Sequence, residues 1–577
     1  MKEKRKTFKS GTTPKPWREL YERALRAHAE ARENMERNMR QFVGTDEIYG
    51  SEERALTTRN ITYEIIESEI DVNIPAPRVR AVSHTARRDS NAVNIERLCE
   101  ALRENLPFEA MNDADERNTY VYGGSVWYVE WDGECDGNSI TGGIRVHCIS
   151  PEDFIPQPGI SEVESMDYCF LRFTTTKREL RRRYGVDGEA LARVECEYSY
   201  GEEGTDDDTV TLTVAFYKGE EGVGKMVFSG DLLLSDIPNY YRRRLHLCAG
   251  CGKPSELCEC DEPTEESVEL ICESAVYPET GKRVTLPYYT PTDFPIVIRK
   301  NTAAPEGLLG LSDCERIRPQ QQAINKVESR ILQKLLRAGI TPVIPEDAAI
   351  TMSNAVFGQV IKLRPGESTD SYGKIDTTPD VSQDIEEADR LYDQAKRVLG
   401  ISDALQGTDH PVAESGYARQ LKISRAEGRL EAKKRLKYHA YSMLYKKIFE
   451  HYLAFSDEPR VLSYKCDDGT VCQAEFNRYN FIEKRDEGEY AYGDEYLFSV
   501  DLNNGSEYSR QVLWERNLSN LQSGTLGDRS DPETLLRYWQ SQERAHYPFA
   551  KENVEYFRSL VDSRSQNCEG DEPSGKV

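Results

Sequence analysis

Residues 312–339, SDCERIRPQQQAINKVESRILQKLLRAG, carry the strongest helix signals in the chain. Ser312 followed by Glu315 forms a capping box, in which the hydroxyl and the carboxylate satisfy backbone N–H groups of the first turn. Pro319 is expected to kink or restart the first turns, and Gly339 supplies the C-terminal stop. Apolar residues recur at steps of three and four on one face, which therefore needs a packing partner: Ile324, Val327, Ile331, Leu335 and Ala338.

Two further helical stretches come after this one. Residues 381–399 carry five acids against three bases, whereas residues 316–339 carry six bases against one acid, so the two helices can pair. A third, basic helix is predicted over 416–455. Between these helices lie a proline-rich excursion over 339–380, expected to be irregular, and a polar loop over 400–415.

The rest of the chain mixes both periodicities. Helices are predicted at 17–43, 52–72, 91–104, 176–184, 506–521, from 530 or 531 onward, and at 551–561. Strands are predicted at 125–131, 143–149, 209–218, 225–234, near 269–287, near 461–476 and at 495–502. The acidic tail from Asn567 is expected to be disordered. The fold class is therefore α+β.

Composition narrows the possible functions. The chain has 577 residues, is 38% hydrophobic and 30% charged, and has no apolar run long enough to cross a bilayer, so we expect no membrane contact. Its N-terminus has no apolar signal core, and a reducing cytoplasm is expected. The 14 cysteines then favour buried thiols or metal ligands over disulfides. The net charge of -25 argues against tight binding to nucleic acid.

Residues 219–226, GEEGVGKM, match a phosphate-binding loop except at the last position. Met226 replaces the hydroxyl that would bind magnesium, and two glutamates would repel a triphosphate. The next residues have the pattern of a strand, although a phosphate site needs a helix N-terminus. The stretch is therefore predicted to be a glycine-rich hairpin turn.

Four cysteines lie within thirteen residues: Cys248, Cys251, Cys258 and Cys260. Four thiolates at this spacing suit tetrahedral Zn²⁺, and a site closed by four sulfurs would be structural. The alternative is a cysteine-containing loop without metal, with His246 and Cys272 as bystanders.

The order of elements from Phe294 onward, FPIVIRKN, GLSDCERIRPQQQAINK, GISDALQG and ESGYARQLKISRAEGRLEAKKR, resembles the portal (head–tail connector) proteins of tailed bacteriophages. Residues 59–77 resemble the N-terminal part of that family. The resemblance implies a portal fold with long stem helices, an α/β wing, a clip and a helical crown, assembled as a dodecameric ring that conducts double-stranded DNA during packaging and ejection.

By position, the resemblance divides the chain into structural parts. They are an N-terminal helical arm (1–45), a wing (46–311) with a cysteine-rich insertion (246–262), stem helices (312–338 and 381–399), a clip (339–380), a tunnel loop (400–415), a long helix with wing strands (416–505), crown helices (506–563) and a tail (564–577). The DNA-channel candidates are Lys326, Arg330, Lys334, Gln406, Thr408, Asp409 and His410.

The resemblance also implies partners and a location. These are the large terminase subunit, head-completion adaptor and tail proteins, the major capsid and scaffolding proteins, and transiently bound duplex DNA. The protein would be assembled in the bacterial host cytoplasm and sit at one capsid vertex of the virion. Two alternatives remain open: another capsid-associated adaptor or minor head protein, and a metal- or nucleotide-dependent nuclease. No catalytic constellation stands out in the sequence, so we expect no enzyme.

Overall fold

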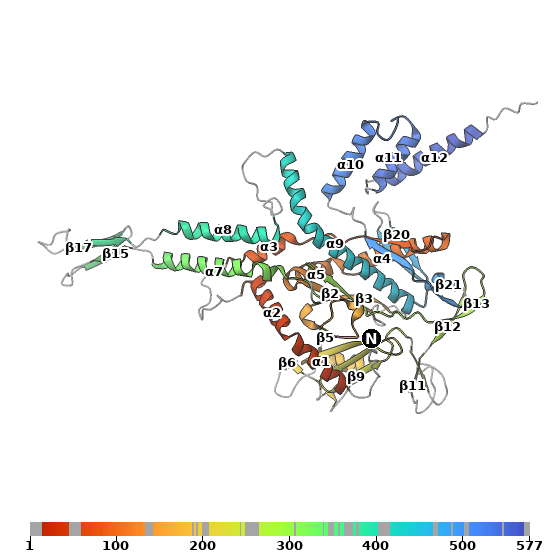
Figure 1. Ribbon diagram of the computed structural model, residues 1–577, viewed down its shortest axis with the longest axis horizontal. Coiled ribbons are helices and arrows are strands. Elements are labelled where there is room, and N and C mark those ends of the chain that lie inside the picture. Colours follow the sequence, from red (N-terminus) through yellow and green to blue (C-terminus); the bar gives the residue numbers. More distant parts are fainter. Residues whose placement is uncertain are drawn as a thin grey trace, which may run out of the picture.

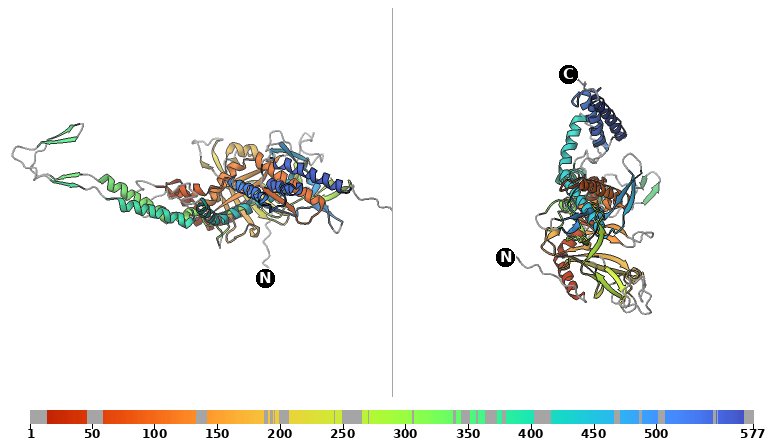
Figure 2. Two further views of the ribbon diagram at one scale, coloured as in Figure 1. Left: turned by 90° about the horizontal axis from the view of Figure 1, so that it is seen from above. Right: turned by 90° about the vertical axis from the view of Figure 1, so that its right-hand side faces the viewer.

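The computed structural model describes most of the chain. The described residues are 14–45, 59–132, 142–186, 190–191, 194, 196–198, 207–242, 244–248, 265–269, 271–304, 307–337, 340–343, 351–355, 358–362, 373–376, 380–401, 416–465, 471–485, 488–500, 507–544, 547 and 549–569. They form an α/β body from which a pair of helices projects to one side (Figures 1 and 2). Helices and strands are mixed along the chain, as the α+β prediction requires.

The N-terminal helix is broken in two. A single helix was expected over 17–43, but α1 (Lys15–Ala27) ends at His28 and α2 (Ala29–Val43) begins directly after it. The His28 Nε2 lies 3.1 Å from the carbonyl oxygen of Pro156, which anchors the break to the body. Trp17 and Ala24 of α1 are buried against the larger sheet of that body.

Two sheets form the layers beneath these helices. The larger has the order β4-β5-β7-β8-β9, with β6 also paired to β7, and the smaller has the order β14-β2-β3. Their strands are β2 (Gly124–Asp132), β3 (Gly143–Ile149), β4 (Phe154–Pro156), β5 (Tyr168–Thr176), β6 (Cys196–Tyr198), β7 (Thr209–Lys218), β8 (Val223–Ser229), β9 (Leu232–Ile237) and β14 (Ile296–Lys300). On β7, Ala215 and Tyr217 face α1, while Val214 and Phe216 face the smaller sheet.

Residues 219–226, which match a phosphate-binding loop except at the last position, contain a hairpin turn, as predicted. It connects β7 and β8, and the N–H of Gly219 donates to the carbonyl of Gly222. The strand expected over 225–234 is instead two strands, because the chain turns at Gly230, which has a positive φ of 56°, between β8 and β9. The short helix expected at 176–184 is α6 (Lys177–Tyr184).

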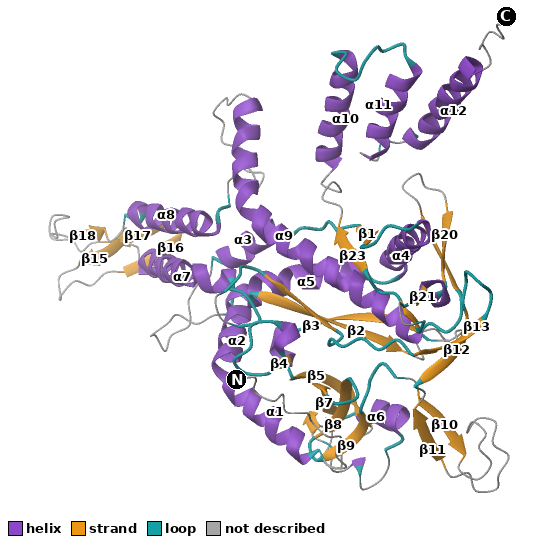
Figure 3. Ribbon diagram, turned by 45° about the vertical axis from the view of Figure 1, so that its right-hand side comes forward, coloured by secondary structure: helices purple, strands orange, loops and turns teal. Residues whose placement is uncertain are grey.

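Helix α9 (Gly416–Phe455) enters the body with its C-terminal half, while its N-terminal end stands clear of the body (Figure 3). Its C-terminal half contributes many of the side chains of the largest apolar cluster, among them Tyr441, Leu444 and Ile448. Around it pack α4 (Ala86–Asn105), α5 (Phe108–Tyr122), β2, β14, β1 (Pro77–Ala81) and β23 (Tyr496–Val500). The core is therefore built on α9.

The projecting pair is α7 (Asp313–Arg337) and α8 (Ser382–Leu399), close to the predicted bounds. Helix α7 is continuous through Pro319, so it does not restart there. Beyond the pair lie four strands where irregular chain was expected: β15 (Ile340–Val343) pairs β18 (Gly373–Asp376), and β16 (Thr351–Ala355) pairs β17 (Gly358–Lys362). Helix α3 (Ile61–Glu69) covers the end of the pair nearest the body.

Hairpins border the body, formed by β10 (Arg244–Cys248) with β11 (Glu265–Glu269), β12 (Cys272–Val276) with β13 (Arg283–Pro287), β19 (Arg460–Lys465) with β20 (Val471–Phe476), and β21 (Ile482–Lys484) with β22 (Tyr490–Tyr492). The C-terminal helices are α10 (Glu507–Gln522), α11 (Pro532–Arg544) and α12 (Ala550–Glu569). The tail was expected to be disordered from Asn567 onward, but helix α12 continues through that residue to Glu569. Among the described helices, none is long and apolar enough to cross a membrane.

Candidate functional site

The paired helices α7 and α8 are the first candidate site, because they leave the body and expose side chains outside it. Near the body their contact is apolar, with Ile317 and Ile324 of α7 buried against Ala395 and Leu399 of α8. Ile61 and Ile65 of α3 close the same cluster. The apolar face that the sequence shows on α7 is therefore covered near the body by elements of the same chain.

Farther out the contact is ionic. Asp384 of α8 is buried and accepts hydrogen bonds from the Arg330 and Lys334 side chains of α7. These hydrogen bonds, that of Lys334 first, lower the pKa of Asp384. Two of the three α7 cations proposed for the DNA channel are thus held within the chain, whereas Lys326 is exposed. The other channel candidates, Gln406, Thr408, Asp409 and His410, lie outside the described residues.

The root of α7 is fixed by hydrogen bonds to the preceding layer. The Ser312 hydroxyl donates to the carbonyl of Val121 at 2.6 Å and lies 3.4 Å from the N–H of Glu315, as half of the predicted capping box. Just before the helix, the N–H of Gly310 donates to the carbonyl of Gly123. A Cβ on Gly310 would meet the carbonyl oxygen of Thr302 at 2.2 Å, so only glycine fits there. These contacts join the start of α7 to α5 and to the glycine that precedes β2.

Behind this root lies a buried charged cluster, which we call the root triad: Glu69, Asp313 and Lys433. The Lys433 Nζ lies 2.6 Å from Glu69 Oε2 and 2.6 Å from Asp313 Oδ2. Both carboxylate side chains are completely buried. Burial lowers the pKa of Lys433, but the two carboxylates outweigh this effect and raise it. The triad joins α3, α7 and α9.

A second buried cluster lies beside it. Arg299 of β14 binds both Asp115 and Glu116 of α5, and Lys437 of α9 lies 2.9 Å from Glu116 Oε1. Burial would raise the pKa of Glu116, but Arg299 and Lys437 lower it. Here Asp115 and Glu116 each have a cation of their own in Arg299 and Lys437, unlike the two carboxylates of the root triad.

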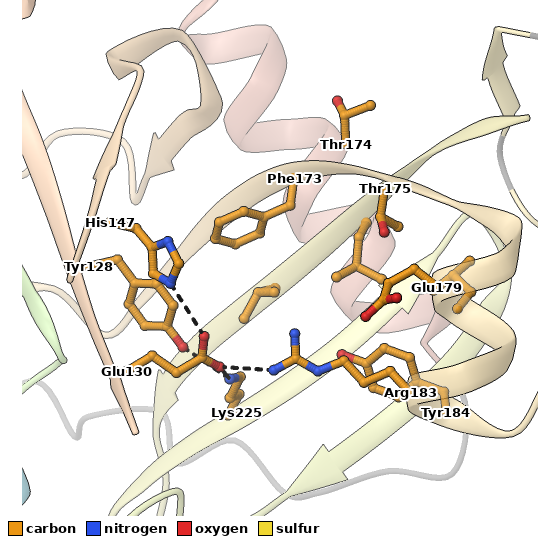
Figure 4. A pocket seen from close by; sticks show the side chains of 13 residues that line it. Tyr128, Glu130, His147, Phe173, Thr174, Thr175, Glu179, Arg183, Tyr184 and Lys225 are labelled. Carbon is orange, nitrogen blue, oxygen red and sulfur yellow. Dashed lines mark hydrogen bonds and ion pairs between the residues drawn. The ribbon is translucent and has the colours of Figure 1, made fainter. Parts of the chain in front are cut away.

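A third group of charges lines a cavity of about 210 Å³ between β2, β8 and α6 (Figure 4). Glu130 Oε1 lies 2.9 Å from Lys225 Nζ and 3.6 Å from Arg183 Nη2, and His147 lies on its other side (Figure 4). Burial opposes ionisation of Glu130, but Lys225 above all lowers its pKa. Two cations, Lys225 and Arg183, thus face the one carboxylate of Glu130, and these ion pairs tie β2, β8 and α6 together.

The cysteine cluster is only partly described. Cys248 ends β10, where its backbone pairs with Glu265 of β11, while Cys251, Cys258 and Cys260 lie outside the described residues. Among the residues that are described, no group of three or more His, Cys, Asp or Glu side chains could hold a metal ion. Cys472 of β20 is disulfide-bonded, which differs from the expectation of free thiols.

The root triad and the cluster around Arg299 were not predicted from the sequence. Glu69 and Asp313 are far apart in the chain, and no local pattern relates them. The adjacent acids Asp115 and Glu116 were visible, and they share a helix face with the buried Asn112 and Thr119. An acid pair on an otherwise buried face could have indicated an internal cation.

Comparison with known proteins finds similarity in structure alone. No family model and no curated protein matches the chain. A chain in a solved structure described as the neck of an empty GTA particle, computed with C6 symmetry, is similar with a TM-score of 0.39 and 10% sequence identity. The match covers 88% of this chain and 93% of that chain.

Proposed function

We propose that the protein is the subunit of a portal ring, a structural conduit for double-stranded DNA at one vertex of a phage capsid. The observation that carries the proposal is the antiparallel pair of α7 and α8, which we call the arm from here on. It leaves an α/β body and has paired strands beyond it (Figure 2). This is the order of stem, clip and returning stem that the sequence resemblance implies. Helix α9 then leads the chain back into the core.

Side chains on the arm favour assembly with further copies. Leu335 of α7 and Ile385 and Val398 of α8 are large apolar residues that are about half exposed. A ring of like subunits would bury such residues between neighbouring arms, since each arm has a neighbour on either side.

The charge of the chain suits a conduit. At -25 per chain, a ring of twelve would carry about -300, so a duplex would be held only by weak, repeated contacts. Arg330 and Lys334 are already paired with Asp384, which leaves fewer free cations on the arm. In this proposal the partners are the terminase, adaptor or tail, capsid and scaffolding proteins, and the role needs no catalysis.

Electron microscopy and light scattering of the purified full chain test the proposal. Closed rings of twelve subunits of 65.9 kDa, with a mass of about 791 kDa, are expected. A stable 65.9 kDa monomer over a wide range of protein and salt concentrations would contradict it. Hydrolysis of ATP by the same sample would contradict the absence of catalysis.

We also propose that Cys248, Cys251, Cys258 and Cys260 hold one structural Zn²⁺ per chain. The β10–β11 pairing supports this, because it brings the two ends of the cysteine stretch together. Metal analysis of protein made without chelators is expected to find one zinc per chain, and replacing Cys248 and Cys251 by Ser should release it. Zinc-free wild-type protein would remove this part of the proposal and leave the ring untouched.

A further inference from the structure

The root triad has more negative than positive charge in a place that water does not reach. Two completely buried carboxylates, Glu69 and Asp313, share the single ammonium group of Lys433. The oxygens that Lys433 does not bind, Glu69 Oε1 and Asp313 Oδ1, are buried and have no hydrogen-bond donor. An uncompensated buried charge is costly, so such a pair favours binding a proton.

The two carboxyl groups are also close enough to share that proton. Glu69 Oε2 and Asp313 Oδ2 both lie 2.6 Å from Lys433 Nζ, so the two carboxyl groups are neighbours, and neighbouring buried carboxylates repel unless one is protonated. A carboxylic acid O–H would supply the donor that the two free oxygens lack.

The charged and titratable groups packed around the triad leave the imbalance in place. From α5, the ring of Tyr120 lies 4.8 Å from Lys433 Nζ, and its hydroxyl donates to the backbone carbonyl of Glu69. Two neighbouring cations outside the triad, Arg299 of β14 and Lys437 of α9, are held by Asp115 and Glu116. Asp71, after α3, lies 3.6 Å from Lys437 and adds another acid to that side.

We propose that Glu69 is protonated and donates a hydrogen bond to Asp313, and that this hydrogen bond fastens the root of α7 to α3 and α9. When the proton leaves, the two carboxylates repel and the root of the arm loosens. This contact between α3, α7 and α9, which we call the latch, is therefore sensitive to pH in the folded chain. It does not depend on whether the chain forms a ring.

The direction of the pH effect is set by burial. Burial, and then the charge of Asp313, raise the pKa of Glu69 to about 8, against the opposing effect of Lys433. The pKa of Glu in an unfolded chain is about 4.3. Because the folded pKa is the higher one, the stabilisation is fully present below about pH 4.3 and is lost as pH rises toward 8.

Hydrogen exchange of the full-length chain tests the latch. Protection factors, which remove the pH dependence of the chemical exchange step, are measured for α3 and for the first two turns of α7 between pH 6 and pH 9. In the wild type they should fall by up to about tenfold per pH unit below pH 8 and level off above it. Glu69→Gln, which needs no proton to donate a hydrogen bond to Asp313, should reduce the fall to less than about twofold.

Glu67→Gln is the matched control, because Glu67 lies on the same helix in an ion pair with Arg117 and should behave as the wild type. Asp313→Asn removes the other carboxylate and should also flatten the profile. The proposal is overturned if both triad variants keep the wild-type fall. It is equally overturned if wild-type protection is constant from pH 6 to pH 8, a measurement that needs no variant to fold. Particle mass recorded on the same samples separates this outcome from the ring proposal.

Discussion

Lys433 of α9 holds the root of the arm, formed by α7 and α8, to the body. It donates to Glu69 and Asp313 at 2.6 Å, and both acceptors are completely buried. Replacing a whole buried ion pair by apolar side chains often changes stability little. Removing only one partner is costly, because the other charge stays buried without a counter-charge. The triad therefore specifies how α3, α7 and α9 meet.

Replacing Lys433 by Met should lower the free energy of unfolding by about 3 kcal/mol, because the buried carboxyl pair loses its cation. Urea unfolding at pH 7 measures the change. The neighbouring Lys434→Met is the control and should shift the midpoint little. Equal effects of the two variants would show that Lys433 is an ordinary surface lysine.

At the scale of elements, the arm is held by a contact that changes character along its length. Apolar side chains such as Ile324 and Leu399 form the part near the body, and Asp384 with two α7 cations forms the outer part. The ionic part fixes the pairing of α7 with α8 and also occupies Arg330 and Lys334. Asp384 thereby controls how much positive charge the arm can offer to DNA.

Asp384→Asn should free Arg330 and Lys334, so nonspecific binding of duplex DNA should strengthen and its salt dependence should steepen. Fluorescence anisotropy of a labelled duplex over a range of salt concentrations measures both. Glu386→Gln, at an exposed position of α8, removes the same charge without releasing a cation. An equal gain in both variants would mean that net charge alone is responsible.

At the scale of the whole molecule, the arm can be altered separately from the body. The body has its own core around α9, and the arm carries apolar residues outside that core, such as Ile385, that are about half exposed. Assembly can therefore be disrupted on the arm without unfolding the body.

Ile385→Glu should leave the secondary structure and melting temperature of the subunit unchanged but prevent rings, because a charge would be buried between neighbouring arms. Light scattering and micrographs of the variant measure this. Val461→Glu, at a residue of β19 that is 58% exposed, is the control and should keep its rings. Rings that persist in the Ile385 variant would place the interface elsewhere.

Local signals predicted the arm well. The cap at Ser312, the three-and-four spacing of α7, and the glycine at position 400 that ends α8 act within a few residues, so their effect is visible without the rest of the fold. The hairpin turn at 219–226 was predicted for the same reason. The break at His28 was missed because its anchor, the carbonyl of Pro156, lies far away in the chain.

The sequence by itself determined the order of the elements and the ends of its amphipathic helices, because caps, turns and periodicity are local. The tertiary structure decided which helix is central. Helix α9 is packed on many sides by α4, α5, β2, β14 and β23, and its helical periodicity alone does not show how many elements surround it. It also decided that Glu69, Asp313 and Lys433 meet, since these residues lie far apart in the chain and come together only when α3, α7 and α9 pack.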